Sequence, residues 1–297
     1  MRITRERLRN ESRDLVELVL LPGLAAVLPW RWCFRLFRWI CFHTHFLYRN
    51  QCERALAQAQ DRGWVDDPRT WIAMRRLVTL IDHADYYLER TRSDAWMQRY
   101  LRVEGTWRTP GSPAVLCTFH WGAGMWALRH AHEHGLHAHM MVAPPRGAHF
   151  DGRTVSRLYA QERTASIARA LGRPTLDVSA SLRPALRAFQ QDEQVIAVVD
   201  VPADQVAVSQ PIELLGMTAR VPRALFRLAV EQALPVSLFL TGIRFDDGQR
   251  TLQIRDIGVY TDVDTLVRDV FTELEAAILK SPPSWHFWSE SERFFRA

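Results

Sequence analysis

From Ala114 onward, short apolar runs alternate with segments of helical periodicity, and this alternation constrains the fold more than any other feature. Short apolar runs bounded by turn residues are typical of buried strands, whereas apolar residues three and four positions apart indicate helices. Such alternation predicts an α/β fold, with a mostly parallel central sheet flanked by helices. The predicted strands are 114–119, 138–143, 194–201, 235–243 and 251–257, and the predicted helices are 124–134, 153–171, 182–191 and 223–233.

The composition is that of a folded globular protein, with 47% hydrophobic and 24% charged residues, and it excludes a disordered or collagen-like chain. The formal net charge is +5, and Lys280 is the only lysine, so arginine carries the positive charge. The basic residues concentrate only near the N-terminus, whereas a nucleic-acid-binding protein gathers them on a face or in runs. We therefore expect no nucleic-acid partner.

The cysteine spacing matches neither a CxxC motif nor a zinc ribbon. Reduced thiols within an apolar core, in a cytoplasmic protein, are the simplest interpretation. The four cysteines are Cys33, Cys41, Cys52 and Cys117.

The N-terminal part of the chain has a membrane-like composition. Residues 15–30 carry one charge, Glu17, but two prolines interrupt the run, which is too short for a confident transmembrane helix. The next segment has an apolar stripe at helical spacing with arginines on another side, the layout of an interfacial amphipathic helix. The alternative is a helix packed on the core. We expect residues 1–48 to associate with a membrane and residues 49–297 to form a single α/β domain. The stripe is Trp30, Phe34, Phe37 and Cys41, and the arginines are Arg31, Arg35 and Arg38.

A candidate for catalysis is His120, which falls where a predicted strand ends and a helix begins. Ligands bind at this edge of open α/β sheets, and histidine is the side chain best suited to act as a base near neutral pH. Gly122 and Gly124 allow a sharp turn and leave backbone N–H groups near a helix N-terminus, where they suit a phosphate or an oxyanion. The alternative is a histidine with a structural hydrogen bond in a strand-to-helix turn.

The sequence around this motif resembles the lipid A biosynthesis (lauroyl/myristoyl) acyltransferases, a branch of the lysophospholipid acyltransferase superfamily. Residues 120–125 stand where that family carries His-Phe-Gly-Asn-Trp-Glu. Residues 182–205 resemble a helix and strand that bring an aspartate, here Asp200. Residues 216–244 resemble a further block of the family, and 281–296 resemble its Pro-x-x-Trp-x-Trp-x-x-x-Arg-Phe ending. The similarity covers nearly the whole chain.

The resemblance implies acyl transfer at the cytoplasmic face of a bacterial inner membrane. The donor would be a thioester of acyl carrier protein or of coenzyme A, the acceptor a lipid or lipid-like molecule, and no cofactor or metal would be needed. The family's arginine falls on Arg169, with Arg163 as the alternative. The implied catalytic residues are His120, Asp200 and Arg169, and the implied substrate-binding residues are Trp121, Gly122, Gly124, Arg220 and Arg223.

One position departs from the family. Five residues after the histidine the superfamily carries Asp or Glu, which orients the imidazole, but this chain has Met125. Another carboxylate, Asp200 or Asp151, can replace the missing acid, or a backbone carbonyl can hold the ring. The remaining alternative is a catalytically silent protein that keeps the fold and binds an acyl lipid or acyl carrier.

A cluster of histidines between 130 and 139 permits a zinc or nickel site, and with it a soluble metal-binding protein. The cluster lacks the H-E-x-x-H spacing, and histidines near a helix C-terminus are favoured by the helix dipole. We expect no metal there.

Overall fold

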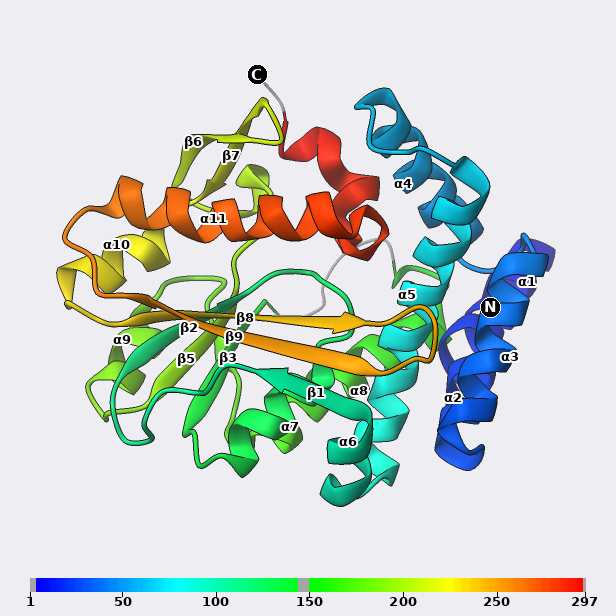
Figure 1. Cartoon of the computed structure of the whole chain (residues 1–297), viewed down its shortest axis with the longest axis horizontal. Helices are drawn as coiled ribbons and strands as arrows, with labels where there is room; N and C mark the ends of the chain where they lie inside the picture. The colour runs from blue at the N-terminus through cyan, green and yellow to red at the C-terminus, as the bar shows by residue number, and fades with distance from the viewer. Residues whose placement is uncertain (1–3, 144–149, 296–297) are drawn as a thin grey trace.

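The computed structural model describes residues 4–143 and 150–295, so the first three residues of the predicted N-terminal segment lie outside it. Seven strands form one sheet in the order β1-β9-β8-β2-β5-β3-β4 (Figure 1). All neighbouring pairs are parallel except β8 and β9, which form an antiparallel hairpin. The strands are β1 (Leu101–Glu104), β2 (Ala114–Thr118), β3 (Ala138–Val142), β4 (Leu176–Asp177), β5 (Gln194–Val198), β8 (Val236–Ile243) and β9 (Arg250–Gly258). The predicted α/β class with a mostly parallel sheet is confirmed.

The predicted strands correspond to the buried centre of the sheet, where apolar runs are longest. β2 is buried along its whole length because β5 and β8 flank it. β1, β4 and a separate hairpin were not predicted from the sequence. The hairpin consists of β6 (Ser209–Leu214) and β7 (Met217–Pro222). These strands are partly exposed, so polar residues interrupt the apolar pattern that identifies a strand.

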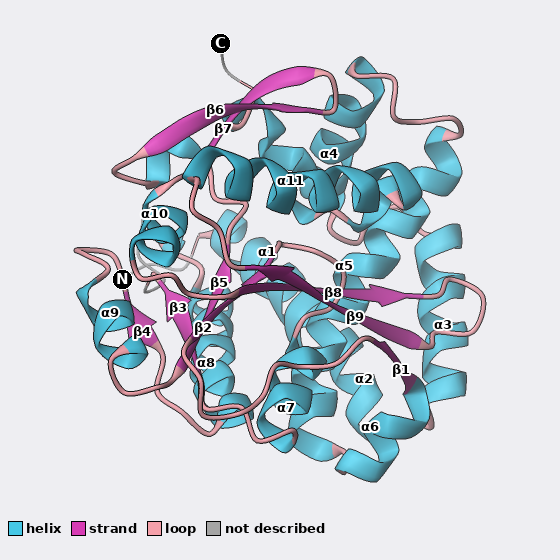
Figure 2. Cartoon of the chain, turned by 60° about the vertical axis from the view of Figure 1, so that its left-hand side comes forward, coloured by secondary structure: helices cyan, strands magenta, loops and turns pink. Residues whose placement is uncertain are grey.

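Helices cover both faces of the sheet (Figure 2). Side chains alternate along β2, so Leu116 faces α7 (Met125–Glu133) and α8 (Thr154–Leu171), whereas Val115 and Cys117 face the opposite layer. That layer contains α9 (Arg183–Phe189), α10 (Ala224–Glu231) and α11 (Val263–Lys280). The result is an α/β/α sandwich.

The N-terminal helices pack beside the sheet against the long helix α5 (Pro68–Thr91), at the right of Figure 1. Trp30, Phe34, Phe37 and Cys41 are buried in a core shared with α5, so they are not available to a bilayer. The alternative of a core-packed helix therefore describes this stripe. The helices are α1 (Arg5–Asp14), a π-helical turn (Leu15–Leu20), α2 (Leu21–Val27), α3 (Trp30–His43), α4 (Arg49–Asp61) and, after α5, α6 (Asp94–Tyr100).

Within residues 4–143 and 150–295, no helix combines the length and hydropathy required to cross a bilayer. All four cysteines are free and buried. Burial raises the pKa of the Cys117 thiol to about 12, which makes it unreactive at neutral pH.

Candidate active site

His120 and Asp200 meet at the carboxyl edge of the sheet. β2 and β5 are parallel neighbours whose last residues, Thr118 and Val198, are paired, so the residues just beyond them emerge side by side. The Asp200 Oδ1 atom accepts hydrogen bonds from the ring Nδ1 of His120 at 2.9 Å and from its backbone N–H at 2.8 Å. Of the two carboxylates that the sequence offered as partners of His120, Asp200 is thus the one that bonds its ring.

This arrangement fixes the tautomer of the imidazole. A carboxylate accepts hydrogen bonds, so Nδ1 of His120 carries a proton and Nε2 of the neutral ring has a free lone pair. The His120 side chain is 41% exposed, whereas Asp200 is fully buried. The ring therefore presents a base to an incoming molecule while its orienting partner is shielded from water. Asp151, the other predicted carboxylate, is exposed in the turn before α8 and has no hydrogen bond to His120.

Met125 is the first residue of α7 and is buried in the apolar cluster between that helix and the sheet. Its side chain is 4% exposed. In this position its side chain packs between α7 and the sheet.

Three consecutive residues near the C-terminus complete the surroundings of this pair. The indole Nε1 of Trp285 donates to Asp200 Oδ2 at 2.9 Å, and the backbone N–H of His286 donates to the carbonyl of His120 at 2.8 Å. The ring of Phe287 meets the His120 ring edge-on, with centroids 4.4 Å apart. We define residues 282–287 as the C-terminal strap. From the sequence, these residues were only part of the family-like ending at 281–296, and no role at the site was predicted for them.

The ring of His286 holds the backbone of the turn after His120. Its Nε2 atom lies 2.7 Å from the carbonyl oxygen of Gly122, which can only accept, so Nε2 carries the proton. Nδ1 then accepts from the guanidinium of Arg75 at 2.7 Å. Burial first, and the charge of Arg75 second, lower the pKa of His286 to about 3, so the ring is neutral at neutral pH. Arg75 is itself buried and donates to the carbonyl of Pro283 at 2.9 Å.

The two glycines of the motif have different roles. Gly122 has φ +58°, and a Cβ there would lie 2.5 Å from the carbonyl oxygen of Thr241. Its N–H donates to the carbonyl of Ser284, so this amide is not available to a ligand as the sequence analysis expected. Gly124 precedes α7 with φ −88° and has open space around it. The N–H groups of Ala123 and Gly124 have no acceptor among the described residues.

Trp121 is buried, and its carbonyl accepts a hydrogen bond from Thr241 Oγ1 at 3.1 Å. It also forms an antiparallel bridge with Trp285. This bridge attaches the strap to the turn that follows β2.

The structure does not bring Arg169 to His120. Arg169 is half-exposed on α8, where it donates to Ser166 at 2.7 Å and lies 3.7 Å from Glu162. The alternative, Arg163, borders a cavity of about 310 Å³ that His286 also lines. Arg163 donates to both carboxylate oxygens of Asp82 at 2.7 Å. Burial is the largest single influence and opposes ionisation of Asp82, but Arg163 and the neighbouring histidines together lower the pKa of Asp82 to about 2.

The other two predicted arginines lie on the β6–β7 side of the molecule. Arg220 is exposed on β7, and its side chain contacts Ser209. Arg223 donates to Gln210 at 2.8 Å and pairs with Asp264. Neither forms a hydrogen bond with His120 or Asp200.

Three histidines of the cluster, His130, His134 and His139, contact other side chains of the protein. His130 Nδ1 accepts from the indole of Trp107 at 2.8 Å, and its ring stacks on His134 with centroids 3.9 Å apart. His139 lies 2.8 Å from Glu193. The described residues contain no group of three His, Cys, Asp or Glu side chains arranged to hold a metal ion.

No protein-family model matches this chain, and a search of curated proteins finds no similar sequence. Only the geometry of the site therefore indicates a function. A histidine oriented by a buried carboxylate can take a proton from a hydroxyl or amine, and unengaged amides nearby can stabilise an oxyanion.

Proposed function

We propose that this protein is an acyltransferase that works at a membrane surface. It moves an acyl chain from a thioester of acyl carrier protein or coenzyme A to a lipid or lipid-like acceptor. The observation that carries the proposal is the hydrogen bond between His120 Nδ1 and Asp200, which leaves Nε2 free on an accessible ring. The proposed location is the cytoplasmic face of a bacterial inner membrane.

In this mechanism, Nε2 of His120 takes the proton of an acceptor hydroxyl or amine as that group attacks the thioester carbonyl. The carbonyl oxygen becomes an oxyanion, which the N–H groups of Ala123 and Gly124 stabilise. Asp200 stabilises the imidazolium. The tetrahedral intermediate collapses, the C–S bond breaks, and the thiolate takes the proton from His120. The products are the ester or amide and the free thiol, and no cofactor takes part.

Met125 favours the alternative of a silent binding protein, since a thioether cannot orient a histidine. Asp200 removes that objection, because a carboxylate just beyond the neighbouring strand can orient the ring in the same way. Its bonds to Trp285 and to the His120 backbone hold it in one orientation. We therefore favour the active enzyme.

The exposed face of α3, and not its buried stripe, is the part that we propose contacts the membrane. Trp32 is 69% exposed and Trp39 is 58% exposed, and their spacing of seven residues puts them on one side of the helix. Large exposed apolar side chains gather in this region, since eight of the thirteen in the described chain precede residue 47. Amphipathic aromatic rings beside arginines suit a lipid–water interface.

The test compares acyl transfer by the wild type, His120→Ala and Asp200→Asn. Purified protein in detergent is mixed with acyl-carrier and coenzyme A thioesters and a total bacterial lipid extract, and the products are read by mass spectrometry. We expect a new acylated lipid, with a rate reduced about 10²- to 10⁴-fold in both variants. Asp151→Asn, a carboxylate change away from His120, serves as the matched control and keeps full activity. Binding of acyl carrier protein without any product in the wild type would instead establish the silent protein.

A further inference from the structure

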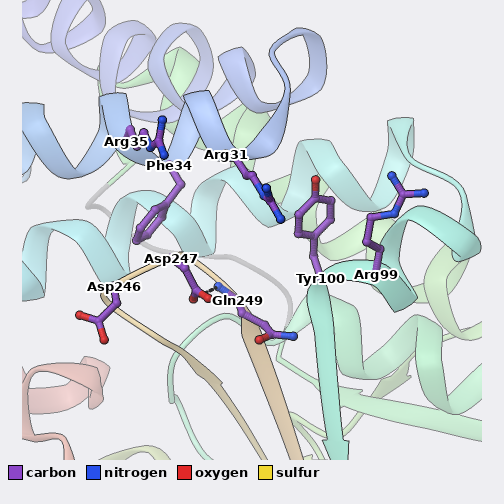
Figure 3. A pocket seen from close by; sticks show the side chains of 8 residues that line it. All are labelled: Arg31, Phe34, Arg35, Arg99, Tyr100, Asp246, Asp247 and Gln249. Atoms are coloured by element: carbon purple, nitrogen blue, oxygen red, sulfur yellow. Dashed lines mark hydrogen bonds between the residues drawn. The ribbon is translucent and has the colours of Figure 1, made fainter.

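A second cavity, of about 320 Å³, lies away from the His120–Asp200 pair. It is bounded by α3, by the end of α6 and by the turn between β8 and β9 (Figure 3). We call it the arginine pocket. Its lining residues are Arg31, Phe34, Arg35, Arg99, Tyr100, Asp246, Asp247 and Gln249.

The arginine pocket has an excess of positive charge. Arg31, Arg35 and Arg99 have neither an ion pair nor a side-chain hydrogen bond with any part of the chain that the structure describes. One of the two carboxylates is already engaged, because Asp247 pairs with Arg244, which lowers its pKa, and accepts from the backbone N–H of Gln249. Asp246 alone therefore opposes three guanidinium groups, and Figure 3 shows it apart from Arg31 on the turn.

The placement of these charges is unfavourable unless an anion is present. Arg31 and Arg35 are four residues apart on α3, a spacing at which like charges lie on one side of the helix and repel each other. Arg99 comes from a different element and adds a third charge to the same cavity. A bound anion would relieve the repulsion among all three.

The donors in the pocket suit a phosphate group. Arginine presents a planar fork of N–H groups that matches phosphate oxygens, and three arginines line this cavity together with Tyr100 and Gln249. Arg31 lies in the middle of the cavity, and Arg35 and Arg99 stand at its two ends (Figure 3). In the figure, Arg31 extends from α3 toward Tyr100 and Gln249. The apolar wall is Phe34, whose ring packs on Gly248 of the turn.

We propose that the arginine pocket binds the phosphate of an anionic lipid headgroup. The lipid source is favoured because Trp32 and Trp39 are exposed on the same helix that supplies Arg31 and Arg35. A lipid with its phosphate in the pocket can then place its acyl chains beside the two indoles. This inference rests on the membrane contact in the proposed function but not on acyl transfer.

The experiment measures flotation with vesicles of phosphatidylcholine alone and of phosphatidylcholine containing phosphatidylglycerol. The triple variant Arg31→Gln, Arg35→Gln, Arg99→Gln is compared with a control triple of equal charge, Arg54→Gln, Arg183→Gln, Arg187→Gln, at exposed positions outside the pocket. We expect the pocket variant to bind anionic vesicles about tenfold more weakly or worse, with binding to phosphatidylcholine unchanged. The control triple should stay close to the wild type. Equal losses in the two triples, or no loss in the pocket triple, would overturn the proposal.

Two further measurements separate the possible reasons for failure. If inorganic phosphate raises the melting temperature of the wild type but not of the pocket triple, while the vesicles are not discriminated, the pocket binds a soluble phosphate and the lipid assignment is wrong. Trp32→Ser with Trp39→Ser tests membrane contact alone, since it should weaken binding to both kinds of vesicle. Acyl transfer is not measured in either, so an inactive protein that passes the flotation test would refute the enzyme and leave this site intact.

Discussion

At the scale of single residues, the turn after β2 depends on a glycine that a longer side chain cannot replace. Gly122 combines a positive φ with a close approach to Thr241, while its carbonyl accepts from His286. These constraints come from three segments far apart in the sequence. The spacing of the glycines indicated a turn, but it could not distinguish the glycine that shapes the turn from the one that leaves an amide free.

Gly122→Ala should therefore cost stability and activity, whereas Gly124→Ala should cost little. The left-handed conformation costs a non-glycine residue about 1–2 kcal/mol, and the contact with the Thr241 carbonyl adds to this. We expect the free energy of unfolding of Gly122→Ala to fall by at least about 2 kcal/mol, measured by chemical denaturation. At Gly124, where nothing lies within 4 Å of a Cβ, the change should be under about 0.5 kcal/mol. Equal losses in the two variants would contradict this account.

An acid introduced at position 125, where the acyltransferases that this chain resembles carry one, should not raise the proposed activity. Nδ1 of His120 is already engaged by Asp200, and Met125 is buried among apolar side chains. Met125→Glu places a carboxylate there with no described partner, so we expect a loss of several kcal/mol in the free energy of unfolding and no gain in kcat. Met125→Leu conserves volume and should cost less than about 1.5 kcal/mol. A rise in kcat for Met125→Glu would mean that Asp200 is not the working acid.

At the scale of elements, the predictions were correct where the apolar pattern within a single segment was enough to identify a strand or a helix. β2, β5 and β8 are mostly apolar, and α8 has the predicted bounds to within a residue. The buried stripe of α3 was harder to interpret, because a bilayer and the surface of α5 demand the same apolar spacing. Only the tertiary structure shows which of the two covers it.

The C-terminal strap is an element whose contribution depends on pH. His286 has a pKa of about 3 in the folded protein, against an ordinary value of 6.5, so between these values the unfolded chain binds a proton that the folded one does not. The stability that neutral His286 supports is therefore present above about pH 6.5 and is lost as the pH falls toward 3. A histidine whose pKa is lowered by folding always makes the folded protein less stable as the pH falls.

His286→Gln should remove that dependence, because an amide can donate to Gly122 and accept from Arg75 without titrating. Between about pH 6.5 and pH 5 the wild type should lose roughly 2 kcal/mol relative to the variant, since one pKa unit is worth about 1.4 kcal/mol. Urea denaturation at both pH values measures the difference. His137→Gln, at an exposed histidine, provides the control and should track the wild type. A constant gap between wild type and His286→Gln would show that this ring is not held neutral.

At the scale of the whole molecule, a buried ion pair joins α5 to the sheet, and Trp30 of the N-terminal helices packs on it. Asp85 on α5 accepts from Arg250 on β9 at 2.9 Å, and both side chains are almost fully buried. The Arg250 guanidinium lies between Trp30 of α3 and Trp126 of α7, at 4.1 and 4.5 Å from the ring centroids. Four elements thus meet at one charge. The sequence analysis placed a boundary after residue 48, and nothing in the spacing of these residues indicated this junction.

The junction predicts that the N-terminal helices and the sheet unfold together. Asp85→Asn leaves the Arg250 charge buried without its counter-ion, which typically costs about 3–5 kcal/mol. We expect a single thermal transition in the wild type and a single, lower one in Asp85→Asn, with tryptophan fluorescence and far-UV circular dichroism changing in parallel. Glu53→Gln, which breaks the exposed Arg49–Glu53 pair on α4, should shift the free energy of unfolding by less than about 1 kcal/mol. A shared core with an ion pair at its centre cannot lose one half while the other half stays folded. Two separate transitions in the wild type would therefore contradict the shared core and favour an N-terminal segment that folds independently.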